Sequence, residues 1–327
     1  MELILNSFGT TLSRENDQFA VSHADGKQLI HPSEIKCISI SKGARITSDA
    51  ALLAIDNEID VLFIDKKGMP KGRIWSSKYG SISTIRRKQL DFTFNEMAVE
   101  WIKDVIRQKL ENQIALLYSS CPVDRLNDVS FNRLLNRIKD YSVKIEGLNG
   151  GIVQDVASSL RGWEGAAGKI YFETLSTFLP EEYKFQGRSQ NPAVDLFNAL
   201  LNYGYGILYG KIEGAMIRAG IDPYVGVFHR DDYNRPVLVF DVIELYRVWV
   251  DYVVFNLCKQ KAIGEECYSR RPDGSVWLEI LGRRILIQSI NDYFDEVILI
   301  KGLERTRLTH LELYCQNLAQ YFLKGKW

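Results

Sequence analysis

The period of the hydrophobic pattern changes once along this chain, and that change constrains the fold more than any other feature. Up to about Trp75, short runs rich in apolar and β-branched residues are separated by turn dipeptides such as Asp25-Gly26 and Lys42-Gly43. Beyond residue 83, apolar residues recur at every third or fourth position over long stretches. Strands followed by helices predict an α+β protein.

The first part of the chain, residues 1–75, is expected to form a small β-sandwich-like domain. Its strand-like runs are ELILN, FAVSH, KCISI and DVLFI, and one helical pattern, SDAALLAIDNEI, interrupts them. No cluster of residues typical of catalysis occurs here. We therefore expect a structural or dimerising module.

The composition becomes small and polar at residues 76–83, SSKYGSIS, and this segment predicts a linker. Residues 84–327 then predict a mainly α-helical catalytic domain. Within it, long amphipathic patterns cover residues 84–120, 129–148 and 152–179.

One short β-hairpin is expected inside the helical domain, at residues 271–288. It would contain the Asp273-Gly274 turn and two short apolar runs, with Gly282-Arg283-Arg284 between them. The final segment, residues 303–327, is expected to be a single amphipathic helix.

The overall composition excludes several classes of protein. The five cysteines are scattered without C-x-x-C spacing, which argues against a disulfide framework or a zinc cluster. No signal peptide and no apolar run of membrane-spanning length is visible. We therefore expect a cytoplasmic protein that is not associated with a membrane. The 41 basic residues balance the 41 acidic ones, so a nucleic-acid surface would have to be local.

Two carboxylates and one imidazole are candidates for a metal site: Glu164, His229 and Glu244. Asp241 and Glu244 are three residues apart on a predicted helix and share one face. Such a donor set suits Mg²⁺ or Mn²⁺, which can activate a hydroxyl and stabilise charge on a phosphoryl group. The alternatives are a solvated acid near a helix start, an exposed loop histidine and a glutamate at the rim of a tight contact.

Glycines surround Glu164, at positions 162, 165 and 168, and a second set follows at spacing four, at positions 206, 210 and 214. Glycine inside a helix costs about 1 kcal/mol relative to alanine, which is tolerated where another backbone must come close. We therefore expect the two helices to pack tightly against each other. That contact would bring Glu164 toward the loop that ends at His229.

Local basic clusters are candidates for contacts with DNA phosphates. Arg161 lies one helical turn before Glu164, where its guanidinium could hold a phosphate beside the metal. Arg86-Arg87 and Arg283-Arg284, the latter in the expected hairpin turn, could add contacts that are independent of DNA sequence. For each of these pairs the alternative is an ordinary solvated face.

At these residues the chain resembles the CRISPR-associated protein one family, the integrase and endonuclease of the spacer-acquisition module. The resemblance covers nearly the whole length and rests on an ordered set of segments: KGARITSDAALLAIDNEIDVLFIDKKGMPKGRIW, RGWEG, Gly187-Arg188, NPAVDLFNALLNYGYGIL, AGIDPYVGVFH and FDVIELYR.

The resemblance implies a metal, Mg²⁺ or Mn²⁺, held by Glu164, His229 and Glu244 with Asp241 beside it. It also implies DNA contacts near Arg188, a homodimer formed through the β-domains, and a small second protein as partner. The family joins short double-stranded DNA fragments into a repeat array, as a free 3′-hydroxyl attacks a phosphodiester of the CRISPR repeat. Glu244 is longer than the aspartate expected there, which allows bidentate ligation or a different metal. The segment after Arg188, beginning Ser189-Gln190, is less basic than expected.

Two hypotheses from different classes follow. The first is a metal-dependent DNA endonuclease and integrase. The second is a catalytically silent DNA-binding scaffold whose acids serve only packing. Dependence of strand transfer on a divalent metal distinguishes them.

Overall fold

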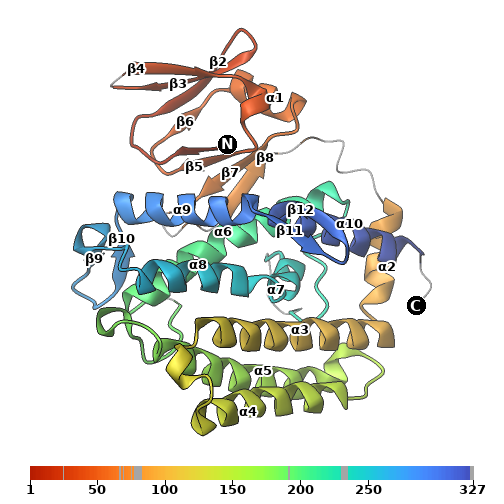
Figure 1. Ribbon diagram of the computed structural model, residues 1–327. Helices are drawn as coiled ribbons and strands as arrows, with labels where there is room; N and C mark the ends of the chain where they lie inside the picture. The colour runs from red at the N-terminus through yellow and green to blue at the C-terminus, as the bar shows by residue number, and fades with distance from the viewer. Residues whose placement is uncertain are drawn as a thin grey trace.

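The computed structural model describes residues 1–24, 26–65, 68, 70–74, 76, 83–190, 192–229 and 235–324. It confirms the α+β class: a strand-rich N-terminal part lies on one side of a mainly helical part (Figure 1). Of the predicted linker, only Ser76 and Ser83 belong to the described residues.

Two four-stranded sheets form the N-terminal part. The first has the order β1-β5-β7-β8 and consists of β1 (Glu2–Leu5), β5 (Cys37–Ser41), β7 (Asp60–Ile64) and β8 (Pro70–Ile74). The second has the order β4-β3-β2-β6 and consists of β4 (Gly26–Ile30), β3 (Gln18–His23), β2 (Thr11–Glu15) and β6 (Arg45–Ile46). The four predicted runs correspond to β1, β3, β5 and β7. With helix α1 (Ser48–Asp56), the sheets enclose a separate core that includes Leu12, Phe19, Ile38 and Val61.

The helices of the C-terminal part are α2 (Ser83–Phe92), α3 (Glu96–Ser120), α4 (Val129–Glu146), α5 (Val153–Ser176), α6 (Leu196–Arg218), α7 (Val237–Ile243), α8 (Arg247–Lys259), α9 (Ile280–Asp295) and α10 (Arg307–Lys324). Short 3-10 turns occur at Pro32–Glu34, Val123–Arg125, Glu181–Tyr183 and Glu265–Cys267. Helix α6 is buried on nearly every side, whereas α3, α4 and α5 form a layer at the edge (Figure 1). Within the described ranges, no helix has the length and apolar character needed to cross a bilayer.

The predicted hairpin is right about its turn but wrong about its extent. Strands β9 (Tyr268–Arg270) and β10 (Val276–Leu278) flank the Asp273-Gly274 turn. Arg283 and Arg284 lie in α9 and not in a turn. The reason is a helical spacing of buried residues that a short apolar run does not reveal: Gly282, Leu286, Ile290 and Phe294.

A second hairpin was not predicted. Strands β11 (Val297–Ile300) and β12 (Leu303–Thr306) pair across Lys301 and Gly302, both of which have positive φ. The last helix therefore begins at Arg307 and not at residue 303. The hydroxyl of Thr306 accepts a hydrogen bond from the Thr309 backbone N–H at 3.1 Å, an N-terminal cap that starts this helix.

The predicted contact between the two glycine-rich helices is wrong. A side chain at Gly210 of α6 would meet Leu62 and Pro70, and one at Gly214 would meet Arg73 and Asp60, so these glycines admit the β-domain. By contrast, no atom of the described residues lies within 4 Å of a Cβ built on the α5 glycines at positions 162, 165 and 168. Small residues permit a close approach but do not specify which neighbour makes it.

Candidate active site

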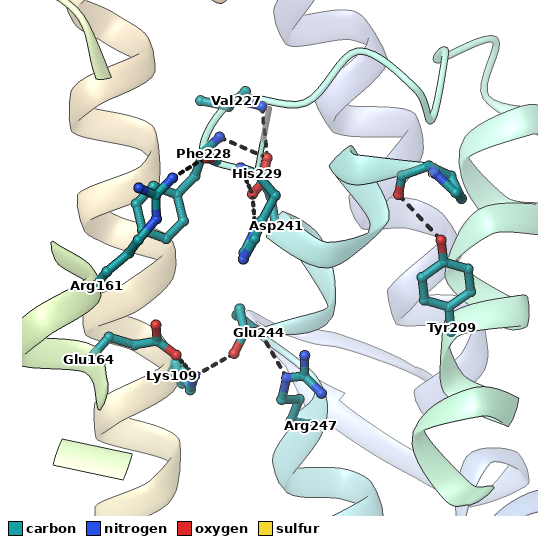
Figure 2. Close-up of polar contacts among 11 residues, drawn as sticks. Lys109, Arg161, Glu164, Tyr209, Val227, Phe228, His229, Asp241, Glu244 and Arg247 are labelled. Atoms are coloured by element: carbon teal, nitrogen blue, oxygen red, sulfur yellow. Dashed lines mark hydrogen bonds and ion pairs between the residues drawn. The ribbon is translucent and has the colours of Figure 1, made fainter. Parts of the chain in front are cut away.

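Three segments that are far apart in the sequence supply the predicted metal-binding residues. Glu164 lies on α5, His229 lies in the segment between α6 and α7, and Glu244 directly follows α7. Figure 2 shows their side chains directed toward the same space. Glu164 and Glu244 also line a cavity of about 510 Å³.

Asp241 holds the loop that carries His229. Its carboxylate is fully buried and accepts the backbone N–H groups of Val227 at 2.8 Å and of Phe228 and His229 at 3.1 Å each. Its Oδ1 also lies 2.7 Å from His229 Nδ1. These contacts fix the ring and leave Nε2 as the nitrogen that can bind a metal, as a carboxylate behind a metal-binding histidine commonly does.

Two further side chains position the same loop. Gln89 of α2 is fully buried; its amide donates to the carbonyls of Asp222 at 2.7 Å and Val225 at 3.0 Å, and its oxygen accepts the Asp222 N–H at 2.9 Å. Arg161 donates to the Phe228 carbonyl at 3.3 Å and lies over the Phe228 ring, 5.1 Å from its centre. The predicted phosphate ligand Arg161 therefore also joins α5 to this loop.

Lys109 of α3 lies between the two glutamates, a feature that the sequence analysis missed. Its ammonium forms ion pairs with Glu164 Oε1 and, at 2.5 Å, with Glu244 Oε2. The second oxygen of Glu244 accepts from Arg247 Nε at 2.8 Å. The available signal was a lysine on the apolar stripe of α3, where Ile102, Ile106 and Leu110 predict a buried residue.

Burial disfavours the charged forms of these side chains, and their opposite charges stabilise one another. Burial opposes ionisation of Glu244, but Arg247 and Lys109 hold the pKa of its carboxyl below its ordinary value. Burial likewise disfavours the Lys109 ammonium, yet Glu244 and Glu164 raise its pKa. For His229, burial lowers the pKa and the hydrogen bond and charge of Asp241 raise it, with a net rise.

The donor types at this site fit a hard divalent cation. Two carboxylates and one imidazole are ligands that Mg²⁺ and Mn²⁺ accept. Glu244 Oε2 is buried and receives no well-directed hydrogen bond from any described residue. In the part of the chain that the structure describes, however, no three His, Cys, Asp or Glu side chains are close enough to hold a metal as they stand. The Lys109 ammonium occupies the space between the two carboxylates, where a bound cation would lie.

Arg188, which the family resemblance marked for DNA, lies in the wall of the same cavity. Its guanidinium donates to Asn202 Oδ1 at 2.8 Å and lies 5.5 Å from the centres of the Phe172 and Tyr205 rings. Behind it, the Tyr205 hydroxyl donates to Asp251, whose burial raises the pKa of the carboxyl to about 6. The arginine is therefore held rigidly beside the two glutamates.

The other predicted DNA contacts lie outside this cavity. Arg86 and Arg87 belong to α2, and Arg283 and Arg284 belong to α9. Figure 1 shows α9 on the side of the helical part that faces the β-domain, opposite α4 and α5. Arg284 lines a second cavity, of about 850 Å³, next to Met1 and Lys36. The structure does not bring these four residues together with Glu164, and their DNA-binding role stays a prediction.

Comparisons with known proteins identify the family of the chain. A family model described as CRISPR associated protein Cas1 matches residues 3–292. The CRISPR-associated endonuclease Cas1 1 of Archaeoglobus fulgidus is 32% identical over 340 residues, which cover 100% of this chain and 97% of the relative.

Two solved structures share the fold. A casposase bound to an integration product has a TM-score of 0.86 at 21% identity, covering 99% of this chain and 91% of that one. A Cas6-RT-Cas1–Cas2 complex has a TM-score of 0.82 at 22% identity, covering 99% of this chain and 35% of that chain. With the family model matching most of its length, the chain belongs to the CRISPR-associated protein Cas1 family.

Proposed function

We propose that this protein is a metal-dependent DNA endonuclease and integrase of CRISPR adaptation. The observation that carries the proposal is a histidine fixed by the buried Asp241 and directed toward two carboxylates in an arginine-lined cavity. The Archaeoglobus fulgidus relative is named an endonuclease, and the casposase of similar fold is bound to an integration product. Both names support the same chemistry.

Glu164, His229 and Glu244 would hold Mg²⁺ or Mn²⁺, with Asp241 orienting the imidazole. A bound divalent cation supplies a Lewis acid for the phosphoryl oxygens and lowers the pKa of an attacking hydroxyl. Arg188 and Arg247 lie beside the carboxylates in the cavity wall, where their fixed charges favour a phosphodiester. In the proposed reaction, the 3′-hydroxyl of a DNA fragment attacks a phosphodiester of the repeat; a new P–O bond to the fragment forms, the P–O3′ bond of the repeat strand breaks, and its 3′-oxygen leaves as a hydroxyl.

The proposed partners follow from the family. They are double-stranded DNA with free 3′ ends, the CRISPR repeat, a second copy of this chain joined through the β-domain, and the small second protein of adaptation. A Cas1–Cas2 complex among the structures of similar fold supports the last of these. The cytoplasm is the proposed location.

One observation favours the second function, a DNA-binding scaffold without catalysis. Lys109 and Arg247 already neutralise Glu244, and Lys109 also reaches Glu164. A carboxylate pair with these cations needs no metal for its charge balance.

Strand transfer on a short duplex with free 3′ ends decides between the two functions. The reaction is assayed with Mn²⁺, with Mg²⁺ and with EDTA, using the wild type and Glu164→Gln. We expect joined product only with a divalent cation and only with the wild type. DNA binding without product under every condition supports the scaffold, and equal product from Glu164→Gln contradicts the proposed site.

A further inference from the structure

Lys109 contacts the oxygens that a divalent cation would need. Its ammonium pairs with Glu164 Oε1 and Glu244 Oε2, one oxygen from each proposed carboxylate ligand. The Lys109 side chain is only 9% exposed and is directed at the site from α3, a helix that supplies no proposed ligand. A cation between these carboxylates and an ammonium on the same oxygens repel each other at short range.

A second acceptor lies on the same helix as Lys109. Gln113 is one helical turn further along α3 and lines the same cavity. Its Oε1 is buried and has no hydrogen-bond partner among the residues that the structure describes, which is costly for a buried acceptor. An ammonium that left the two glutamates could donate to this oxygen without leaving the cavity.

We propose that the Lys109 ammonium competes with the divalent cation for Glu164 and Glu244. To bind fully, the cation must displace this ammonium from the two carboxylates toward Gln113. The inference rests on the proposed function, because it assumes a metal at these carboxylates. It goes beyond that function by making Lys109 the residue that sets how tightly the metal binds. Because binding couplings are reciprocal, the metal destabilises the Lys109 ion pairs by the same free energy by which these ion pairs oppose metal binding.

The competition has a signature that a purely structural lysine lacks. Lys109→Met keeps the length and apolar part of the side chain and removes the charge. We expect the dissociation constant for Mn²⁺ to fall tenfold or more, since one nearby positive charge is removed. Without metal, we expect a melting temperature several degrees lower, because Glu244 loses one of its two cations.

Lys103→Met is the matched control. Lys103 lies on the same helix, is similarly buried with a 6% exposed side chain, and pairs with Glu100 at 2.8 Å and the Leu148 carbonyl at 2.7 Å. We expect it to lower the melting temperature and to leave the Mn²⁺ dissociation constant unchanged. Gln113→Leu removes the second acceptor, and we expect it to weaken Mn²⁺ binding several-fold.

The test titrates the full-length wild type and the variants with Mn²⁺ alone, at one pH, and follows free Mn²⁺ by electron paramagnetic resonance. Glu164→Gln establishes the site: if it binds Mn²⁺ as tightly as the wild type, the proposed metal site fails. If Glu164→Gln weakens binding and Lys109→Met binds no tighter than the wild type, the inference about Lys109 is wrong and the metal site stands. If Lys109→Met does not fold, Gln113→Leu decides: weaker binding supports the competition, and wild-type affinity contradicts it.

Discussion

Two buried charge clusters of this protein look alike in composition and differ in surroundings. At the joint between the β-domain and α6, Arg73 pairs with Asp60 at 3.2 Å and with Glu213 at 2.9 Å. At the candidate active site, Lys109 pairs with Glu164 and Glu244. Each cluster places one buried cation between two carboxylates and lies next to a glycine-bearing helix.

The surroundings separate a joint from a site. The Arg73 side chain is 3% exposed and also donates to the Gly210 carbonyl at 2.9 Å, so the β-domain fills the space beside α6. Next to Lys109 a cavity of about 510 Å³ remains, with Gly165 and Gly168 in its wall. The comparison teaches that paired charges alone do not mark a function. Among the described residues, Arg73 Nε and Nη1 at the joint and Gln113 Oε1 at the candidate site are all buried without a hydrogen bond, so the open space beside the charges is what distinguishes the candidate site.

At the candidate active site, His229→Ala is expected to have the largest effect on the rate of strand transfer. Removing a metal ligand removes several kcal/mol of transition-state stabilisation, so strand transfer should fall by more than about 100-fold. The melting temperature should change little, because the His229 side chain is partly exposed. Single-turnover strand transfer with Mn²⁺ measures the rate, and near-normal transfer would remove His229 from the site.

Arg73→Met should show the opposite pattern at the joint. It removes one partner from the partly buried carboxylates of Asp60 and Glu213, while Asp60 keeps its ion pair with Arg218. The free energy of unfolding is therefore expected to fall by about 1–3 kcal/mol. Strand transfer by the remaining folded protein should stay near the wild-type rate. Urea denaturation measures the stability. A large loss of rate without loss of stability would show that the joint takes part in catalysis.

Asp241→Asn tests the support of the histidine rather than the metal ligands themselves. The amide keeps the size of the side chain but weakens the contacts to three backbone N–H groups and to His229 Nδ1. Changes to such supporting groups typically cost 10–100-fold, so we expect about that loss in Mn²⁺ affinity. Unchanged affinity would mean that the ring orientation does not depend on Asp241.

The pH dependence of stability reports the same contact without any metal. The pKa of His229 is raised in the folded protein above the ordinary value of 6.5, so its stabilising contribution is fully present below about pH 6.5. That contribution is lost as the pH rises through the folded-state pKa. The stability difference between the wild type and His229→Gln should therefore shrink over this range in urea denaturation. A constant difference would contradict a charged contact with Asp241.

Arg161→Ala and Arg284→Ala give the smallest expected effects and separate chemistry from binding. Arg161 contacts the loop of His229, so its loss should slow strand transfer at saturating DNA more than it weakens DNA binding. Arg284 lies on α9, away from the cavity, so its loss should leave the rate unchanged. If DNA crosses α9, the slope of log affinity against log salt should flatten by about one unit. A normal rate for Arg161→Ala would reduce it to a structural contact.

Much of the fold could be predicted from the sequence, because the change of hydrophobic period reflects backbone geometry directly. The errors occurred where a short pattern fits two structures. The run that follows Gly282 is apolar enough for a strand, and only its continuation to Phe294 shows the helical spacing. The glycines of α5 and α6 were recognised as places of close approach, but the sequence does not name the approaching partner. For Gly210 and Gly214 of α6 the partner is the β-domain, whereas Gly165 and Gly168 of α5 line a cavity.

The sequence names the proposed ligands of the candidate site, whereas most of the residues that support them become visible only in the structure. Family resemblance selected Glu164, His229 and Glu244, and the folded chain directs them to one space. Asp241 and Glu244 look equivalent at spacing three, yet one is fully buried behind the histidine and the other faces the cavity. Lys109 lies on α3 and Gln89 on α2, and both reach the site from helices that carry no proposed ligand. No spacing within the sequence links them to the site.

Anomalous X-ray diffraction from crystals of the protein soaked in Mn²⁺ tests the central claim most directly. The account predicts one strong peak bounded by Glu164, His229 Nε2 and Glu244, with the Lys109 ammonium moved off both carboxylates toward Gln113. A crystal with Lys109 still on both glutamates and no peak between them, or with the peak elsewhere in the molecule, would contradict the metal site on which the proposed function depends.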